Sequence, residues 1–156
     1  MISVNIPGRE ESIRIEHVVL DYNGTIACDG RLIEGAAERI GELSKLAKVY
    51  ILTADTYGTV RQQCEGIGAE VKTFAHAGAA VCKEEIVREL GEHVCVIGNG
   101  FNDIQMMDLS ELGICVIDRE GAYSGLINHS DIIVNNALDA LDLLLKTDRI
   151  KADLRN

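Results

Sequence analysis

The sequence predicts a doubly wound α/β domain, in which a parallel sheet carries helices on both faces. Short apolar runs rich in β-branched residues alternate along the chain with longer segments that have the period of a helix. This alternation is typical of three-layer folds. A chain of 156 residues with 47% hydrophobic content can form one continuous core, so we expect a single domain over residues 1–156.

The expected strands share an apolar, β-branched composition and span residues 17–20, 49–52, 69–73, 94–97, 113–117 and 131–134. The expected helices carry apolar residues three and four positions apart and span residues 36–47, 57–66, 83–90, 102–109 and 137–146. Residues 1–16 alternate weakly around Pro7-Gly8, which favours a small hairpin. The polar tail of residues 147–156 favours a short helix or a frayed end.

Charge and cysteine content exclude several classes of protein. With 15 Lys and Arg against 25 Asp and Glu, the net charge is -10, which is the opposite of a nucleic-acid binder. Five separated cysteines without a CxxC pair indicate reduced, mostly buried side chains. The N-terminal segment lacks the apolar run of a signal peptide, and no apolar stretch approaches the roughly 20 residues that span a bilayer. We therefore expect a cytoplasmic protein with neither a nucleic-acid nor a membrane partner.

Polar residues cluster where an open parallel sheet binds its ligands, beyond the carboxyl ends of the strands. They are Asp21-Tyr22-Asn23-Gly24-Thr25 after the first strand, Thr53 after the second, Lys83 at the start of the third helix, and Gly98-Asn99-Gly100-Phe101-Asn102-Asp103 after the fourth strand. In order and spacing these four segments resemble the four motifs of the haloacid dehalogenase (HAD) superfamily. The resemblance covers residues 17–146 and implies a HAD-like Rossmannoid fold.

The likeness is greatest to the catalytic domain of P-type ATPases and the small soluble phosphatases related to it. The segment KEEIVREL, followed by VCVIGNGFNDIQMM, looks like the stretch of those pumps that leads into their acidic loop. ILTADT, residues 51–56, resembles their LTGD segment. One such fragment is a weak signal, whereas four motifs in order are a strong one. The resemblance therefore implies a Mg²⁺-dependent phosphohydrolase.

The resemblance assigns a chemical role to each motif. Asp21 would attack phosphorus and form an aspartyl-phosphate, which divides hydrolysis into two easier steps. The catalytic residues implied are Asp21, Asn23, Thr53 and Lys83. The residues implied to hold the phosphate are Gly24, Thr25, Thr53, Ala54, Lys83 and Asn102, with the backbone N–H groups of Gly24 and Thr25 facing it. Taken singly, Thr53 could instead be a helix N-cap and Lys83 a solvated surface residue.

Mg²⁺ is the expected cofactor, because this hard cation prefers oxygen ligands and reduces repulsion between an anionic nucleophile and an anionic substrate. By the family pattern its ligands would be the Asp21 carboxylate, the Asn23 backbone carbonyl and the Asn99 side chain, with Asp103 close by. Asn99 stands where the family has a metal-binding Asp, so we expect weaker metal affinity. Asn23 and Asn99 each precede a glycine, so a hydrogen-bonded turn is an alternative reason for asparagine at these two positions.

Asn23 is the second departure from the family pattern. Most superfamily phosphatases have Asp there, and its carboxyl protonates the leaving group and then activates water. An amide cannot transfer that proton, and general acid–base catalysis is worth ~10² to 10⁴ in rate. Hydrolysis is therefore expected to be slow or confined to good leaving groups. P-type ATPases have Thr at this position, which fits their longer-lived phosphoenzyme.

Motif spacing leaves no room for a cap domain. Residues 26–52 can hold a short flap, near residues 26–33, and one helix, whereas residues 54–82 can hold a helix, a strand and a loop. The site is therefore expected to be open, with Tyr22, Cys28 and Phe101 near its mouth. For Cys28, packing in the core or the flap is the favoured alternative. An open site implies a bulky phosphorylated substrate or a neighbouring subunit of a homo-oligomer over the entrance.

Two other classes of function compete with the hydrolase. A phosphate-binding or regulatory module with little turnover would account for Asn23 and Asn99. The joint presence of Asp21, Thr53, Lys83 and Asp103 argues against it. A dinucleotide-binding site at Gly98-Asn99-Gly100 lacks the third glycine of GxGxxG and follows the fourth strand rather than the first.

Overall fold

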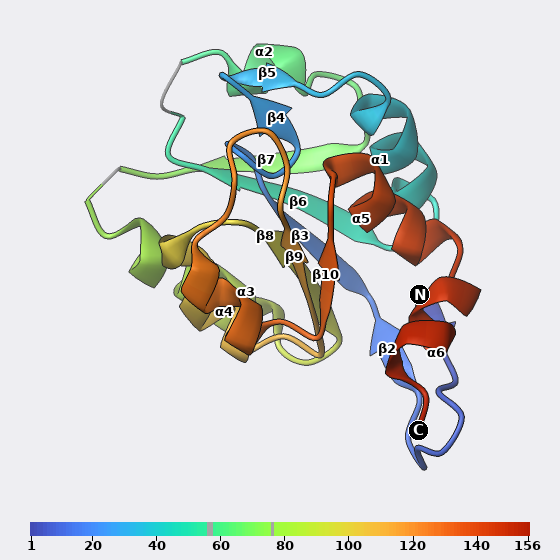
Figure 1. Cartoon of the computed structure of the whole chain (residues 1–156). Coiled ribbons are helices and arrows are strands. Elements are labelled where there is room, and N and C mark those ends of the chain that lie inside the picture. Colours follow the sequence, from blue (N-terminus) through green and yellow to red (C-terminus); the bar gives the residue numbers. More distant parts are fainter. Residues whose placement is uncertain (56–57, 76) are drawn as a thin grey trace.

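A central sheet of six parallel strands organises the computed structural model, which describes residues 1–55, 58–75 and 77–156 (Figure 1). In spatial order the strands are β10 (Ile132–Val134), β9 (Leu112–Val116), β8 (Val94–Gly98), β3 (His17–Asp21), β6 (Lys48–Thr53) and β7 (Ala69–Thr73). All six predicted strands are confirmed, to within one residue at each end. The parallel α/β fold is thereby confirmed as well, with β3 and β8 in the middle of the sheet.

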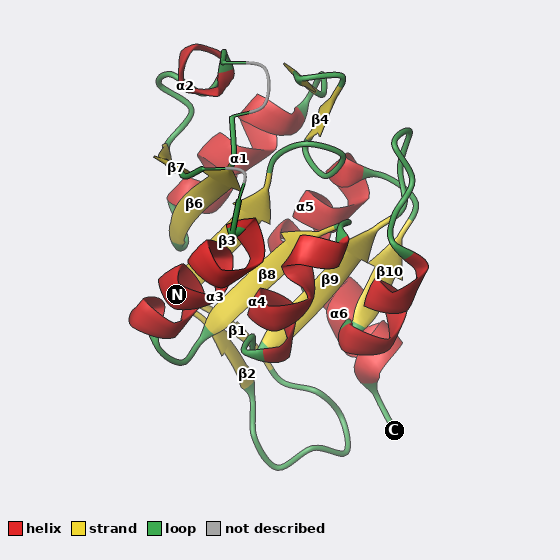
Figure 2. Ribbon diagram, turned by 90° about the vertical axis from the view of Figure 1, so that its left-hand side faces the viewer, coloured by secondary structure: helices red, strands yellow, loops and turns green. Residues whose placement is uncertain are grey.

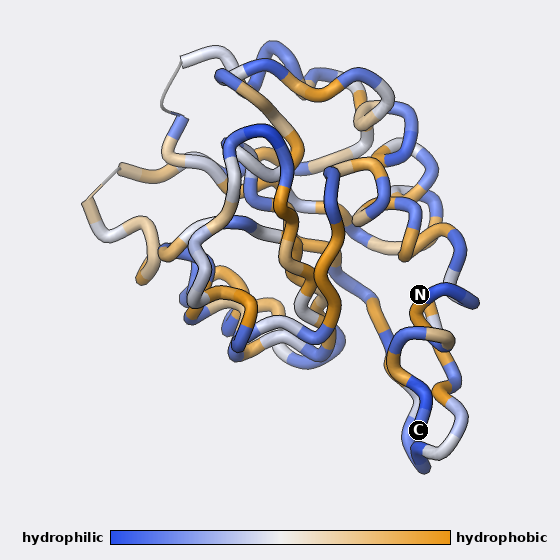
Figure 3. The backbone as a smooth tube through the Cα atoms, in the orientation of Figure 1, coloured by the Kyte–Doolittle hydropathy of each residue, from blue (hydrophilic) through white to orange (hydrophobic). Residues whose placement is uncertain are grey.

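Helices cover both faces of the sheet. On one face α1 (Ala36–Ser44) packs against α5 (Ala137–Leu145), and on the other lie α3 (Ala79–Leu90), α4 (Ile104–Asp108) and the 3-10 helix η2 (Ser124–His129) (Figures 1 and 2). Successive residues of a strand point to opposite faces. Val18 and Leu20 accordingly join the core beneath α1 and α5, whereas Val19 joins the core beneath α3 and α4. In Figure 3 the hydrophobic colour is concentrated along strands such as β9 and β10, and hydrophobic and hydrophilic residues alternate along the helices.

The two ends of the chain lie together at one side of the sheet. β1 (Ile2–Val4) pairs antiparallel with β2 (Ile13–Ile15), and α6 (Asp148–Leu154) packs against β1 (Figure 1). Alternate hairpin residues are buried, as is Ile150 of α6, and all of them join the core beneath α1 and α5. The hairpin and the tail therefore share the core of the main sheet.

Helix boundaries differ from the prediction by more than one residue in four places, one of which is the end of α1 at Ser44 and not at residue 47. Helix α3 begins at Ala79, after Gly78 at φ 83°, so Lys83 lies one turn inside the helix and not at its start. The helix expected over residues 102–109 is divided into the 3-10 helix η1 (Phe101–Asp103) and α4. Residue 57, where another helix was expected to begin, lies outside the described residues, and the described helix there is α2 (Val60–Gln63).

No separate domain stands over the carboxyl end of the sheet in the part of the chain that the structure describes. Between β3 and β6 the chain forms a two-stranded sheet of β4 (Ala27–Cys28) and β5 (Arg31–Leu32), followed by α1. Between β6 and α3 it forms α2 and β7. The expected flap is thus a small hairpin. A helix long and apolar enough to cross a bilayer is absent among the described residues.

Candidate active site

Asp21 ends the central strand β3 and lies at the floor of a cavity of about 300 Å³. The strands on either side, β6 and β8, end at Thr53 and Gly98, so the three strand ends open on the same space. The cavity is lined by Asp21, Asn23, Thr53, Ala54, Phe74, Ala79, Lys83, Asn99, Gly100 and Asn102. Parallel strands therefore bring together residues that lie far apart in sequence, as the strand-end argument predicted.

Lys83 joins the nucleophile candidate to the loop after β8. Its Nζ donates to Asp21 Oδ1 and Asp103 Oδ1, both at 2.6 Å, and to Asn102 Oδ1 at 3.1 Å. The Lys83 side chain is only 2% exposed, and that of Asp103 is fully buried. A lysine this buried is rarely found unless it is paired. The alternative of a solvated surface lysine is therefore wrong.

The other oxygen of Asp103 fixes the loop that follows β8. Asp103 Oδ2 accepts from the backbone N–H groups of Asn99, at 3.0 Å, and Gly100, at 2.8 Å. A Cβ added to Gly98 would lie 2.6 Å from Asp103 Oδ2, so only glycine permits this approach. Asp103 is not among the residues that line the cavity, and both its oxygens are engaged. In this arrangement Asp103 positions Lys83 and the loop, and its predicted contact with Mg²⁺ stays a prediction.

Thr25 links the first motif to the fourth. Its Oγ1 lies 3.0 Å from Asp21 Oδ2 and 3.1 Å from Asn99 Oδ1. Gly24, at φ 80°, makes this turn, and a Cβ there would lie 2.2 Å from Asn99 Nδ2. The expectation that the N–H groups of Gly24 and Thr25 face the phosphate is wrong, because they donate to the carbonyls of Ala27 and Tyr22.

Thr53 and Asn23 offer polar groups to the cavity. Thr53 Oγ1 accepts from the Asp55 backbone N–H at 2.9 Å, which leaves the hydroxyl hydrogen available to a ligand. Asn23 Oδ1 is buried and has no hydrogen-bond partner among the described residues. A buried polar atom without a partner costs about 1–3 kcal/mol. The free hydroxyl hydrogen of Thr53 can therefore serve a ligand in the cavity, and Asn23 retains an acceptor that no described residue uses.

The buried charges alter each other's ionisation. Burial raises the pKa of Asp21 to about 6, and the nearby Asp103 carboxylate adds to the rise, whereas Lys83 and Thr25 oppose it. Burial would lower the pKa of Lys83, but the Asp21 and Asp103 carboxylates hold it above its ordinary value. At neutral pH the site therefore contains an ionised carboxylate beside a fixed ammonium group.

The oxygen set beside Thr25 fits a hard cation. A hydroxyl has one hydrogen, so Thr25 can donate to Asp21 Oδ2 or to Asn99 Oδ1 but not to both. One acidic or amide oxygen is therefore left facing the cavity without a donor from Thr25. Carboxylate and amide oxygens are suitable ligands for Mg²⁺, which also keeps several waters. The residues present thus fit the expected metal.

The mouth of the site differs from the prediction at Tyr22, whereas Cys28 lies in the flap strand β4, the alternative favoured for it. Tyr22 is completely buried, and its hydroxyl donates to the Gly30 carbonyl at 3.2 Å, so it does not line the mouth. Cys28 lines a different cavity, between the flap and Arg119. Phe101 is 66% exposed and stands between the lining residues Gly100 and Asn102, but it does not itself line the cavity. Sequence reasoning missed Phe74, although it follows the end of β7 in the same way that Ala54 follows β6.

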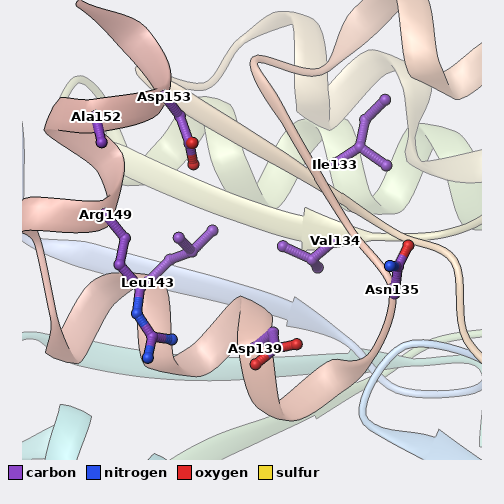
Figure 4. Close-up of a pocket in the computed structure, with 8 residues that line it drawn as sticks. All are labelled: Ile133, Val134, Asn135, Asp139, Leu143, Arg149, Ala152 and Asp153. Carbon is purple, nitrogen blue, oxygen red and sulfur yellow. The ribbon is translucent and has the colours of Figure 1, made fainter.

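A larger cavity, of about 560 Å³, lies between β10, α5 and α6 (Figure 4). Its charged residues Asp139, Arg149 and Asp153 are all exposed. Shifted pKa values and unpaired buried polar groups mark a reactive site, and exposed charges such as these are not expected to show either. The cavity around Asp21, although smaller, is therefore the better candidate.

Comparisons with known proteins bear on the family to which this chain belongs. A family described as haloacid dehalogenase-like hydrolase matches residues 4–108. An uncharacterized protein of Methanocaldococcus jannaschii is 44% identical over 81 residues, which are 49% of this chain and 87% of that protein. A copper-transporting ATPase of Schizosaccharomyces pombe is 24% identical over 131 residues, which are 81% of this chain but only 14% of the ATPase.

Solved structures show the same fold at low identity. The cobalt-bound deoxy-D-mannose-octulosonate 8-phosphate phosphatase of Haemophilus influenzae superposes with a TM-score of 0.71 at 13% identity, over 92% of this chain and 95% of that one. The corresponding phosphatase of Moraxella catarrhalis, in complex with magnesium, phosphate and a KDO molecule, gives 0.70 at 14% identity, over 88% and 90%. Because the matched family spans more than half of the chain and includes Asp21, Thr53, Lys83 and Asp103, this chain belongs to the haloacid dehalogenase-like hydrolases.

Proposed function

We propose that the chain is a divalent-metal-dependent phosphohydrolase that cleaves phosphate esters through an aspartyl-phosphate on Asp21. The observation that carries the proposal is the buried bridge from Lys83 to Asp21 and Asp103, with both N–O distances at 2.6 Å. This bridge places an ionised carboxylate and a fixed positive charge at the floor of one cavity. A nucleophile and an electrostatic stabiliser of the transferred phosphoryl group are thereby preorganised.

In the first step an oxygen of Asp21 attacks phosphorus, and the bond between phosphorus and the ester oxygen breaks. Lys83 offsets the negative charge, and the free hydroxyl hydrogen of Thr53 is available to a phosphoryl oxygen. The leaving oxygen takes the bonding electron pair and needs a proton from water. In the second step water attacks phosphorus, inorganic phosphate leaves, and the Asp21 carboxylate is restored.

A neutral side chain at position 23 limits both steps. Asn23 lines the cavity, and its buried Oδ1 can accept a hydrogen bond, but the side chain has no acidic proton to give. Leaving groups that are stable as anions need no such proton. The enzyme should therefore prefer activated esters, and the aspartyl-phosphate should persist longer than it would with an acid–base residue in place.

A divalent metal, when bound, would reduce the repulsion between nucleophile and substrate and polarise a phosphoryl oxygen. Asp21 and Asn99 would hold it with side-chain oxygens, and Asn23 with its backbone carbonyl. The two phosphatases to which the fold is similar were solved with magnesium and with cobalt, which supports a divalent cation here. Mg²⁺ is our choice because all the candidate ligands are oxygens.

The test is metal-dependent phosphate release from an activated aryl phosphate and from a panel of natural phosphate esters. The native chain should release phosphate with Mg²⁺ and not after chelation, and Asp21→Asn should abolish release. Asp153→Asn is the matched control, since it makes the same chemical change on an exposed residue of the distant cavity. Equal background rates in all three proteins would overturn the hydrolase proposal.

A phosphate-binding or regulatory module is the second candidate, and Asn23 is the observation that favours it. The two candidates are distinguished by quenching the native chain with acid during turnover and measuring the phosphate that stays covalently bound to it. A hydrolase forms and loses a phosphoenzyme within the time of turnover, whereas a module binds phosphate without covalent labelling of Asp21. That the substrate is a phosphorylated small molecule or macromolecule stays a prediction. That a homo-oligomer covers the open site also stays a prediction.

A further inference from the structure

Two exposed aromatic side chains stand beside the candidate active site. Phe101 is 66% exposed and Tyr123 is 44% exposed, although they come from loops more than twenty positions apart. Their ring centroids are 5.1 Å apart, and the ring planes meet at 84°. This edge-to-face arrangement is a favourable one for aromatic pairs. In a chain with two Phe, four Tyr and no Trp, such a pair on the surface is unusual.

The pair is held in place from two sides. The Tyr123 backbone N–H donates to the Asn99 carbonyl at 2.8 Å, which fastens its loop to the loop after β8. The Tyr123 ring also packs over Gly125, where an added Cβ would lie 2.4 Å from the ring. Tyr123 therefore supports one side of Phe101, which remains 66% exposed.

Phe101 is tied to the cavity by its neighbours in sequence. Gly100 and Asn102 both line the cavity, and Phe101 stands between them in η1. The other phenylalanine of the chain, Phe74, lines the cavity itself. Phe101 itself is not among the lining residues, so only a substrate that extends past Gly100 and Asn102 would reach its exposed ring.

The charged residues that the structure describes around the cavity offer no free cation that could recognise the leaving group in place of an aromatic contact. Lys83 is the one cation among the described residues that line the cavity, and two carboxylates already engage it. The chain as a whole carries a net charge of -10, which disfavours leaving groups with further negative charge. A neutral, flat leaving group can instead bury apolar surface against Phe101.

We propose that Phe101, supported by Tyr123, is a specificity-determining residue that stacks on a flat ring in the leaving group of the phosphate ester. This inference rests on the proposed phosphohydrolase function. It identifies the preferred substrate class as phosphate esters of aromatic or heteroaromatic groups, without a second anionic centre near the phosphate.

The test compares the binding of phenylphosphonate and methylphosphonate, which differ only in the ring and are not hydrolysed. Dissociation constants are measured by NMR titration of the full chain with Mg²⁺. The native chain should bind phenylphosphonate roughly 2- to 10-fold more tightly, the range that one aromatic contact supplies. Phe101→Ala and Phe101→Leu should bring this ratio close to one, since Leu keeps an apolar side chain but removes the ring.

Two further variants separate positioning from general damage. Gly125→Ala should displace the Tyr123 ring and lower the ratio, although Gly125 does not line the cavity. Ile133→Ala is the matched control, because Ile133 is an exposed apolar residue of β10, and its ratio should equal the native one.

The outcomes separate this inference from the proposal on which it rests. If both phosphonates bind equally well to the native chain, the phosphate pocket stands and the aromatic inference is overturned. If neither binds, the proposed function fails and the inference fails with it. An oligomer that dissociates in Phe101→Ala, together with equal affinities for the two probes, would assign the pair to a subunit contact and also overturn the inference.

Discussion

Replacing Lys83 with methionine should destabilise the fold far more than the same replacement at Lys45. Lys83 and Lys45 each lie 2.6 Å from a carboxylate oxygen, so the two ion pairs have the same length. They differ in burial, because the Lys83 and Asp103 side chains are 2% and 0% exposed, whereas those of Lys45 and Glu42 are 66% and 55% exposed. Methionine keeps an apolar stem of similar length at both positions, so the comparison isolates the charge.

The expected magnitudes follow from that difference. Removing one partner of a buried pair costs about 3–5 kcal/mol, since the remaining charge is left without compensation. Removing one partner of an exposed pair costs about 0.2–1 kcal/mol. Urea unfolding followed by circular dichroism, in the presence of a chelator, measures the free energy of unfolding of each variant at pH 7. Values for Lys83→Met and Lys45→Met that agree to within about 0.5 kcal/mol, the margin for surface changes, would refute the reasoning.

The loss in free energy of unfolding caused by Lys83→Met should also depend on pH. Without Lys83, burial and Asp103 raise the pKa of Asp21 with only Thr25 in opposition. A carboxyl group whose pKa is higher in the folded state than in the unfolded state opposes folding at high pH, and this cost disappears as pH falls below the unfolded value of about 3.9. In the native chain the pKa of Asp21 is already raised to about 6, so below that pH protonation of Asp21 stabilises both proteins equally. The difference in free energy of unfolding should therefore be largest above pH 7 and should shrink as pH falls to about 6. A difference that is constant over this range would show that lost packing, and not charge, is the cause.

Three other changes test separate parts of the structure. Asn23→Asp should accelerate the release of poor leaving groups by ~10² to 10⁴, measured as phosphate release from an alkyl phosphate, because it supplies the missing acid–base group; no gain would contradict the role given to Asn23. Gly24→Ala should lower thermal stability, since alanine is strained at φ 80° and its Cβ would lie 2.2 Å from Asn99 Nδ2, and an unchanged melting temperature would contradict this geometry. Burial would raise the pKa of Asp142, but hydrogen bonds from Lys146 and Arg39 hold it below its ordinary value. The native chain should therefore lose stability faster than Asp142→Asn as pH falls below about 4, the unfolded value; parallel unfolding curves would exclude that contribution.

Much of the candidate site could be predicted because its residues follow local rules. Asp21 and Thr53 directly follow runs of buried, β-branched residues, so their place at the strand ends was readable from short segments. Gly78, at φ 83°, shows where such rules stop. It starts α3 four residues before the predicted boundary, because a glycine in the left-handed region can begin a helix as well as interrupt one. The position of Lys83 inside the helix was therefore missed.

The sequence by itself determined the class of the fold, the six strands and the motifs at their ends, because periodicity and composition act over a few neighbouring residues. Only the tertiary structure decided what those motif residues do to one another. Lys83 meets Asp21 across 62 positions and turns a strand-end carboxylate into part of a buried ion bridge. The strand order, the engagement of both Asp103 oxygens and the pairing of Phe101 with Tyr123 likewise depend on contacts between distant segments. Such contacts form only when burial brings separate strand ends to one edge of the sheet, and no local pattern encodes them.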